Sequence, residues 1–269
     1  MTAAFADVER ATDSKQFRGL ARLGLAARAV IYLLVAWLAV LIARGTPGKE
    51  ADQRGALQEV ASHTGGTVVL WILAAGLIGY SLWRFSEAAF GVTGEGKKAG
   101  PRVQSFVRGC IYAFFAVNAI VLLVTSSSGS QAKQQQEWAG KVMTHAAGRW
   151  AVGLLGVVVV AVGAFQVYEG LSRKFAANLK RYRMSDRQYR IVLVLGVIGT
   201  IARGLVFVVA GVLVVRAALD ADAHKARGLD GALRSLAGTA AGPWLLYAAA
   251  AGLFVFGLYG LAEAMWRRT

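Results

Sequence analysis

Three arginines and three glutamates that lie inside long apolar segments are the residues best suited to chemistry in this chain. Each arginine is followed four residues later by an aromatic, and each glutamate stands 21 residues after a glycine and four after an aromatic. The arginines and their aromatics are Arg28 with Tyr32, Arg108 with Tyr112, and Arg203 with Phe207. The glycines, aromatics and glutamates are Gly66, Trp83 and Glu87; Gly148, Phe165 and Glu169; and Gly242, Tyr259 and Glu263.

Charged residues inside long apolar segments have two possible uses. An unpaired ionisable group inside a membrane costs about 2.5 kcal/mol or more. The three sets of arginine, glycine and glutamate mark three repeats, each a hairpin of two helices. Each arginine could therefore pair with a glutamate, in its own hairpin or in the next repeat, and stack on the nearby aromatic. Such pairs would fix the register of neighbouring helices. Alternatively, the three arginines could form an anion-attracting ring at the mouth of a pathway, because intramembrane charges often mark ligand or ion routes.

The motifs of common enzyme classes are missing from the sequence. It has no GxxxxGK[ST] phosphate loop, no HExxH, no CxxC and no Ser/His/Asp set at one membrane depth. We therefore expect a protein that is not an enzyme and has no cofactor and no metal site. Arg84 and Gln166 share one repeat position near the inner edge of a span, where their polar ends could reach the headgroups.

The elements that position these residues are six apolar segments of about 20 residues, the length that crosses a bilayer. The chain has 269 residues and a mean hydropathy of +0.50, so these segments fill much of it. They predict an all-α polytopic membrane protein with six transmembrane helices. The segments are Leu20–Ala43, Thr67–Phe90, Val103–Val124, Trp150–Leu171, Ile191–Val215 and Pro243–Met265.

The charged motifs make the six helices one two-helix hairpin used three times. The spacing from arginine to glycine is 38, 40 and 39 residues, which predicts approximate threefold symmetry among antiparallel hairpins. Short amphipathic helices are expected in two connections, Gly55–Ala61 and Gly231–Ala237. The predicted boundaries are a polar cytoplasmic tail at 1–17 and repeats at 18–91, 102–175 and 193–268, which together form one membrane domain.

The charge distribution predicts the orientation. The chain has 30 Lys and Arg against 15 Asp and Glu, a basic excess that would also suit nucleic-acid binding. However, 20 of these 30 cations lie on the side that holds both termini, and 10 on the other. This asymmetry follows the positive-inside rule and predicts that both termini are cytoplasmic. Anionic lipid headgroups are then the expected partners, together with a possible membrane-protein partner, and no nucleic acid.

One segment resembles a known family. The run Gly76-Leu-Ile-Gly-Tyr80-Ser-Leu-Trp83-Arg84, together with the preceding GALxxLA pattern and helix-opening glycine, is similar to the bacterial family called domain of unknown function 1206. The resemblance covers nearly the whole chain as three copies and implies a six-helix inner-membrane protein, without implying an activity. We expect a structural, accessory, lipid-binding or partner-binding membrane subunit. The alternative is a small transporter or channel with an arginine-lined cytoplasmic mouth at the repeat interface.

Overall fold

The computed structural model describes residues 15–45, 50–91, 99–125, 131–220, 222, 228–237 and 242–267. These residues are almost entirely helical, which confirms the predicted all-α fold. Most of the predicted polar tail at 1–17 lies outside the described residues.

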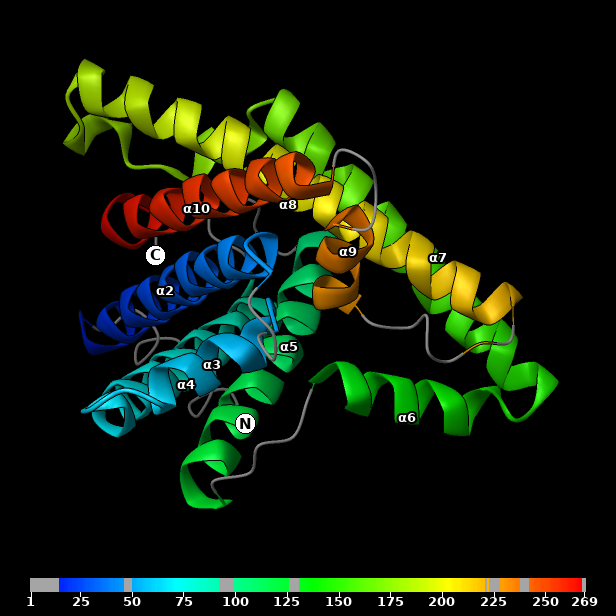
Figure 1. Cartoon of the computed structure of the whole chain (residues 1–269). Coiled ribbons are helices and arrows are strands. Elements are labelled where there is room, and N and C mark those ends of the chain that lie inside the picture. Colours follow the sequence, from blue (N-terminus) through cyan, green and yellow to red (C-terminus); the bar gives the residue numbers. More distant parts are fainter. Residues whose placement is uncertain are drawn as a thin grey trace.

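Six helices are long and apolar enough to cross a membrane, as predicted. One of them, α8, has 34 residues and is therefore about 51 Å long, well beyond the hydrocarbon thickness of a bilayer. It starts with a capping box in which Ser185 and Gln188 satisfy each other's backbone N–H groups. The six are α2 (Lys15–Ala43), α4 (Gly66–Phe90), α5 (Ala99–Thr125), α7 (Ala146–Leu171), α8 (Asp186–Leu219) and α10 (Gly242–Trp266) (Figure 1).

Shorter helices join the long ones. Within the repeats, α3 (Gln53–Ala61), α6 (Gln131–Met143) and α9 (Gly228–Ala237) connect the first long helix to the second. Two 3₁₀ helices, η1 (Lys174–Asn178) and η2 (Arg181–Arg183), lie between α7 and α8. We call the end where α3, α6 and α9 lie the connection end. The opposite end, where α2, α5 and α8 begin, is the arginine end.

The three repeats contact one another through equivalent interfaces. The second helix of each repeat packs along the first helix of the next: α4 on α5, α7 on α8, and α10 on α2. In each interface one position of the second helix faces the carbonyl of the residue after the motif arginine. The Ser81 Oγ donates to Gly109 O at 2.9 Å; a Cβ on Gly163 would lie 2.7 Å from Gly204 O, and one on Gly257 3.2 Å from Ala29 O. The approximate threefold symmetry is therefore built into these interfaces.

The symmetry is broken in the middle repeat. In repeats one and three the two long helices pack as hairpins, α2 with α4 and α8 with α10. The helices α5 and α7 of the middle repeat do not pack along each other, and Figure 1 shows α5 leaning away from α7. The middle pair of helices therefore departs from the predicted packed hairpin, and the ring of six helices is open between α5 and α7.

The connecting helices explain this difference. In repeats one and three the predicted amphipathic helices are present as α3 and α9, and each contacts both long helices of its repeat. They bury Leu57 and Leu233, and the backbone N–H of Ala51 donates to Asp230 Oδ1 at 3.0 Å, which links the two connections. In contrast, α6 packs on α7 and α9 rather than between α5 and α7. The middle repeat thus lacks a connecting helix that contacts both of its long helices.

Candidate functional site

The first polar group joins repeat one to repeat three. Arg28 on α2 forms an ion pair and hydrogen bond with Glu263 on α10, and the same carboxylate accepts from Arg267 Nη1 at 2.6 Å. Arg28 and Glu263 are only 8% and 5% exposed. The helices can approach this closely because Gly260 has no side chain: a Cβ there would lie 2.9 Å from the Ala29 Cβ. This buried ion pair fixes the register of α2 against α10.

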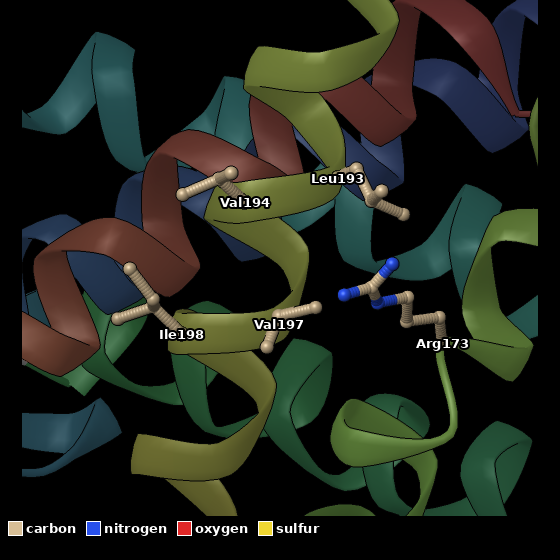
Figure 2. A pocket seen from close by; sticks show the side chains of 5 residues that line it. All are labelled: Arg173, Leu193, Val194, Val197 and Ile198. Atoms are coloured by element: carbon tan, nitrogen blue, oxygen red, sulfur yellow. The ribbon is translucent and has the colours of Figure 1, made fainter.

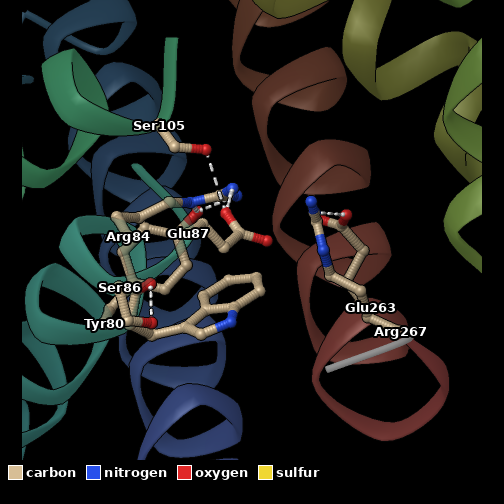
Figure 3. Close-up of polar contacts among 8 residues, drawn as sticks. Tyr80, Arg84, Ser86, Glu87, Ser105, Glu263 and Arg267 are labelled. Carbon is tan, nitrogen blue, oxygen red and sulfur yellow. Dashed lines mark hydrogen bonds and ion pairs between the residues drawn. The ribbon is translucent and has the colours of Figure 1, made fainter. Parts of the chain in front are cut away.

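The second polar group joins α4 to α5. Arg84 donates from Nη1 to Glu87 Oε2 at 2.6 Å, and from Nε and Nη2 to the Tyr80 hydroxyl at 3.0 and 2.7 Å. The Ser105 hydroxyl on α5 donates to the same Glu87 oxygen at 3.0 Å. Figure 3 shows this group opposite the pair formed by Glu263 and Arg267. The Trp83 ring lies near both groups. Its centroid is 4.4 Å from the guanidinium carbon of Arg84 and 5.4 Å from that of Arg267.

The third arginine has aromatic rather than acidic neighbours. Arg203 on α8 donates from Nε to the Tyr32 hydroxyl at 2.7 Å, and its guanidinium carbon lies 4.9 Å from the centroid of the Phe207 ring. The same guanidinium carbon lies 5.0 Å from the centroid of the Phe256 ring. The guanidinium carbon of Arg28, on α2, lies 5.6 Å from that centroid. Within the described residues, no carboxylate forms an ion pair with Arg203.

Arg108 and Glu169 form no ion pair in the part of the chain that the structure describes. Arg108 is half-buried on α5, one turn before Tyr112, whose ring centroid lies 4.5 Å from that of Tyr80. Glu169 is half-buried on α7, and Phe165, one turn earlier, is exposed. Both helices border the open side of the ring, so the middle repeat supplies one motif arginine and one motif glutamate without a salt bridge.

The pairing of a motif arginine (Arg28, Arg108 or Arg203) with the motif glutamate of its own repeat is thus not formed among the described residues. The observed pair, Arg28 with Glu263, follows the other predicted possibility, which joins neighbouring repeats. The physical reason is the equivalent interfaces described above, in which the second helix of one repeat packs along the first helix of the next. Only at α2 and α10 does this neighbour relation become an ion pair.

Sequence reasoning missed several members of the two groups. Arg84, interpreted as reaching the headgroups, is instead 2% exposed and bound to Glu87 and Tyr80. Its place three residues before Glu87 was the available signal, because residues at this spacing are neighbours on a helix. Arg267 has the same relation to Glu263 at a spacing of four. Ser105 had no signal in the sequence, since only the packing of α5 on α4 brings it to Glu87.

The motif glycines have a steric role at the connection end. A Cβ on Gly66 would lie 1.8 Å from the Val60 carbonyl oxygen, and one on Gly148 would lie 1.6 Å from that of Val142. The connecting helix therefore ends directly against the start of the next long helix. As predicted from their positions, Gly66 and Gly242 begin α4 and α10, whereas α7 begins at Ala146, two residues before Gly148.

One hollow lies away from these polar groups. It has a volume of about 130 Å³ and is lined by Arg173 and by four apolar residues near the start of α8 (Figure 2). Arg173 has a φ of 56°, and Figure 2 shows its side chain directed toward Leu193 and Val197. The lining offers one cation and no acid, so the hollow brings together no set of groups for catalysis. The remaining lining residues are Val194 and Ile198.

The fold and the site define a multi-pass membrane protein made of three two-helix repeats whose interior is rich in arginine. The chain belongs to the family described as Domain of Unknown Function (DUF1206), whose model matches it three times, at residues 23–91, 103–173 and 198–267. It is 28% identical over 249 residues to Uncharacterized protein YxxB of Bacillus subtilis (strain 168), covering 91% of this chain and 90% of that protein. No solved structure matches the chain.

Proposed function

We propose that this chain is a binding or accessory subunit of the bacterial cytoplasmic membrane, which holds lipid or a partner membrane protein and catalyses no reaction. The observation that carries this proposal is that an apolar core separates the buried arginines, Arg28 and Arg84, from the connection end. The exposed faces of α5 and α7 also support it.

The core between the arginines and the connection end is apolar. Val35, Leu38, Leu246 and Leu253 are buried there, and α3 and α9 close the connection end of the packed helices. A transported ion or polar solute needs polar partners along its whole route, because an apolar interior does not replace its hydration. A polar cluster under an apolar core is better suited to holding a ligand or a partner than to conducting one.

The helices α5 and α7 supply surface for such a partner. In each helix, only 22% of the most apolar membrane-spanning residues are buried inside the protein. Their exposed side chains are large and apolar, for example Phe114 on α5 and Leu154 on α7. In a bilayer these faces contact lipid chains, or the helix of another protein that packs on them.

The basic residues favour a cytoplasmic position for the arginine end. The segment between α7 and α8 contains η1 and η2 and is rich in Lys and Arg, and its Arg181, Arg183 and Arg187 are exposed. Under the positive-inside rule this segment faces the cytoplasm, where anionic headgroups attract it. Both termini would then be cytoplasmic as well.

A small transporter or channel with an arginine-lined cytoplasmic mouth at the repeat interface is the second candidate. The observation that favours it is that Arg108 and Arg203 form no ion pair with a described carboxylate. Arginines in this state attract anions, as the entrance of an anion pathway requires.

One experiment separates the two candidates. The protein is purified from its native membrane in a mild detergent, and native mass spectrometry identifies what remains bound. A stoichiometric lipid or protein supports the binding subunit. In parallel, proteoliposomes are tested for uptake of chloride and phosphate. Uptake above that of protein-free liposomes, lost in an Arg203→Gln variant and kept in an Arg187→Gln variant, would overturn the binding role in favour of transport.

A further inference from the structure

The arginine end contains more positive than negative charge in its interior. We define the arginine cluster as Arg28, Arg84, Arg108, Arg203 and Arg267 together with Glu87 and Glu263. Even when the half-buried Glu169 is added, five cations face three carboxylates. Such an excess inside a membrane domain is costly unless a counter-charge is supplied from outside the chain.

The cluster also contains hydrogen-bond donors that no described residue uses. Arg28 is only 8% exposed, and its buried Nε has no acceptor among the described residues. The bond of Arg203 goes to a neutral phenol, the Tyr32 hydroxyl. Buried donors in proteins are almost always paired, so these groups indicate a ligand that accepts hydrogen bonds.

The geometry of the donors indicates what kind of ligand fits. The guanidinium carbons of Arg28 and Arg203 lie 5.6 and 5.0 Å from the centroid of the same Phe256 ring, although they come from different repeats. An anion placed between these two planar guanidinium groups would meet donors from both, an arrangement suited to the paired oxygens of a phosphate. The surrounding aromatic rings of Tyr32, Tyr80 and Phe256 keep the local dielectric low and strengthen the attraction.

We propose that the arginine cluster binds a phosphate group, held by Arg203, Arg108 and the free Nε of Arg28. The headgroup of an anionic phospholipid is one source of this group, because the ring is open between α5 and α7 and both helices are largely uncovered. A soluble phosphate from the aqueous side is the other source. This site rests on the proposed binding role and gives that role its ligand chemistry.

The test compares lipids that differ in the phosphate alone. The full chain is delipidated in detergent and titrated with phosphatidylglycerol, with diacylglycerol of the same acyl chains, and with inorganic phosphate. Binding is followed by native mass spectrometry and by the midpoint of thermal unfolding. The variants are Arg203→Gln and Arg108→Gln. Arg187→Gln is the matched control, because it removes the same charge from an exposed position near the start of α8.

The wild-type protein is expected to bind phosphatidylglycerol and not diacylglycerol. Each cluster variant should bind it at least about tenfold more weakly, the usual effect of losing one charged hydrogen bond, and the control should bind as the wild type does. If Arg203→Gln does not fold, Arg108→Gln still carries the test, because the Arg108 guanidinium forms no ion pair with a described residue. Binding of inorganic phosphate alone, with the same dependence on the two arginines, would support the phosphate site with a soluble source.

The site and the binding role can fail separately. Equal binding of phosphatidylglycerol by the wild type and both cluster variants would overturn the phosphate site, while leaving a lipid-binding protein whose site lies elsewhere. A wild-type protein that retains neither lipid nor protein partner and conducts anions would overturn the binding role itself.

Discussion

Replacing Glu263 by glutamine removes the negative charge that joins α2 to α10. The carboxylate accepts from Arg28 and from Arg267, and both arginines would remain in the interior without a counter-charge. The change in shape is small, so the effect reports the ion pair rather than a cavity. We expect the folded bundle to lose stability without changing its helix content.

The size of the loss follows from the burial of the pair. Breaking a buried ion pair by removing one partner costs about 3–5 kcal/mol. The lower part of this range applies here, because Arg28 keeps its contacts with the Tyr80 and Phe256 rings, at 5.9 and 5.6 Å from their centroids. A loss of about 3 kcal/mol in a chain of this size lowers the midpoint of thermal unfolding by roughly 6–12 °C.

The assay is thermal unfolding in a fixed detergent, followed by circular dichroism and by the loss of the monodisperse peak in size exclusion. Glu169→Gln is the matched control, because Glu169 occupies the same repeat position and forms no ion pair with a described residue. Its midpoint should stay within about 2 °C of the wild type, as expected for a change below about 0.5 kcal/mol. A Glu263→Gln midpoint no lower than that of Glu169→Gln would refute the role of the pair as a staple between repeats.

Three further predictions follow from packing, exposure and charge. Gly163→Leu should prevent the close packing of α7 on α8, seen as loss of monodisperse protein, because even a Cβ would lie 2.7 Å from Gly204 O. Gly153→Ala should be tolerated, because its Cβ would lie 3.5 Å from its neighbour; equal expression of the two variants would contradict the interface. Cys110 is exposed on α5, and because a thiol that faces lipid forms little thiolate, it should react with a charged maleimide in denatured protein but not in membranes; labelling in membranes would place this face in water. A cysteine replacing the exposed Ser185, in a Cys110→Ala background, should react with a charged maleimide only from the cytoplasmic side, and labelling from outside intact cells would reverse the proposed orientation.

The six spans and the three repeats could be predicted from the sequence because both depend on local patterns. Hydropathy marks each span, and the spacing of arginine, glycine and glutamate marks each repeat. The opening between α5 and α7 could not be predicted in this way, because it depends on where a connecting helix packs. The different composition of the middle connection was visible, but only the structure shows that α6 leaves α5 and α7 unjoined.

The members of the polar cluster were partly predictable, and their partners were not. The repeat singled out Arg28 and Glu263 by position, but the sequence left open whether a pair would form inside a hairpin or between repeats. The pair forms between repeats because α2 and α10 lie close together. This closeness depends on Gly257 and Gly260, which face α2. Small residues on a helix show that some helix approaches, without showing which one.

One repeat position explains why three similar motifs form three different arrangements. It lies three residues before the glutamate and is occupied by Arg84, Gln166 and Gly260 in the successive repeats. Where it is Gly260, nothing stands between the helices, and Arg28 of the neighbouring repeat reaches the glutamate. Where it is Arg84, that side chain forms the ion pair with Glu87, and Arg108 has no carboxylate partner among the described residues. Where it is Gln166, which is buried with an unpaired Oε1, neither arrangement forms. A Gly260→Arg substitution would therefore be expected to push α2 away from α10 and release Arg28 from Glu263, because even a Cβ there would lie 2.9 Å from the Ala29 Cβ.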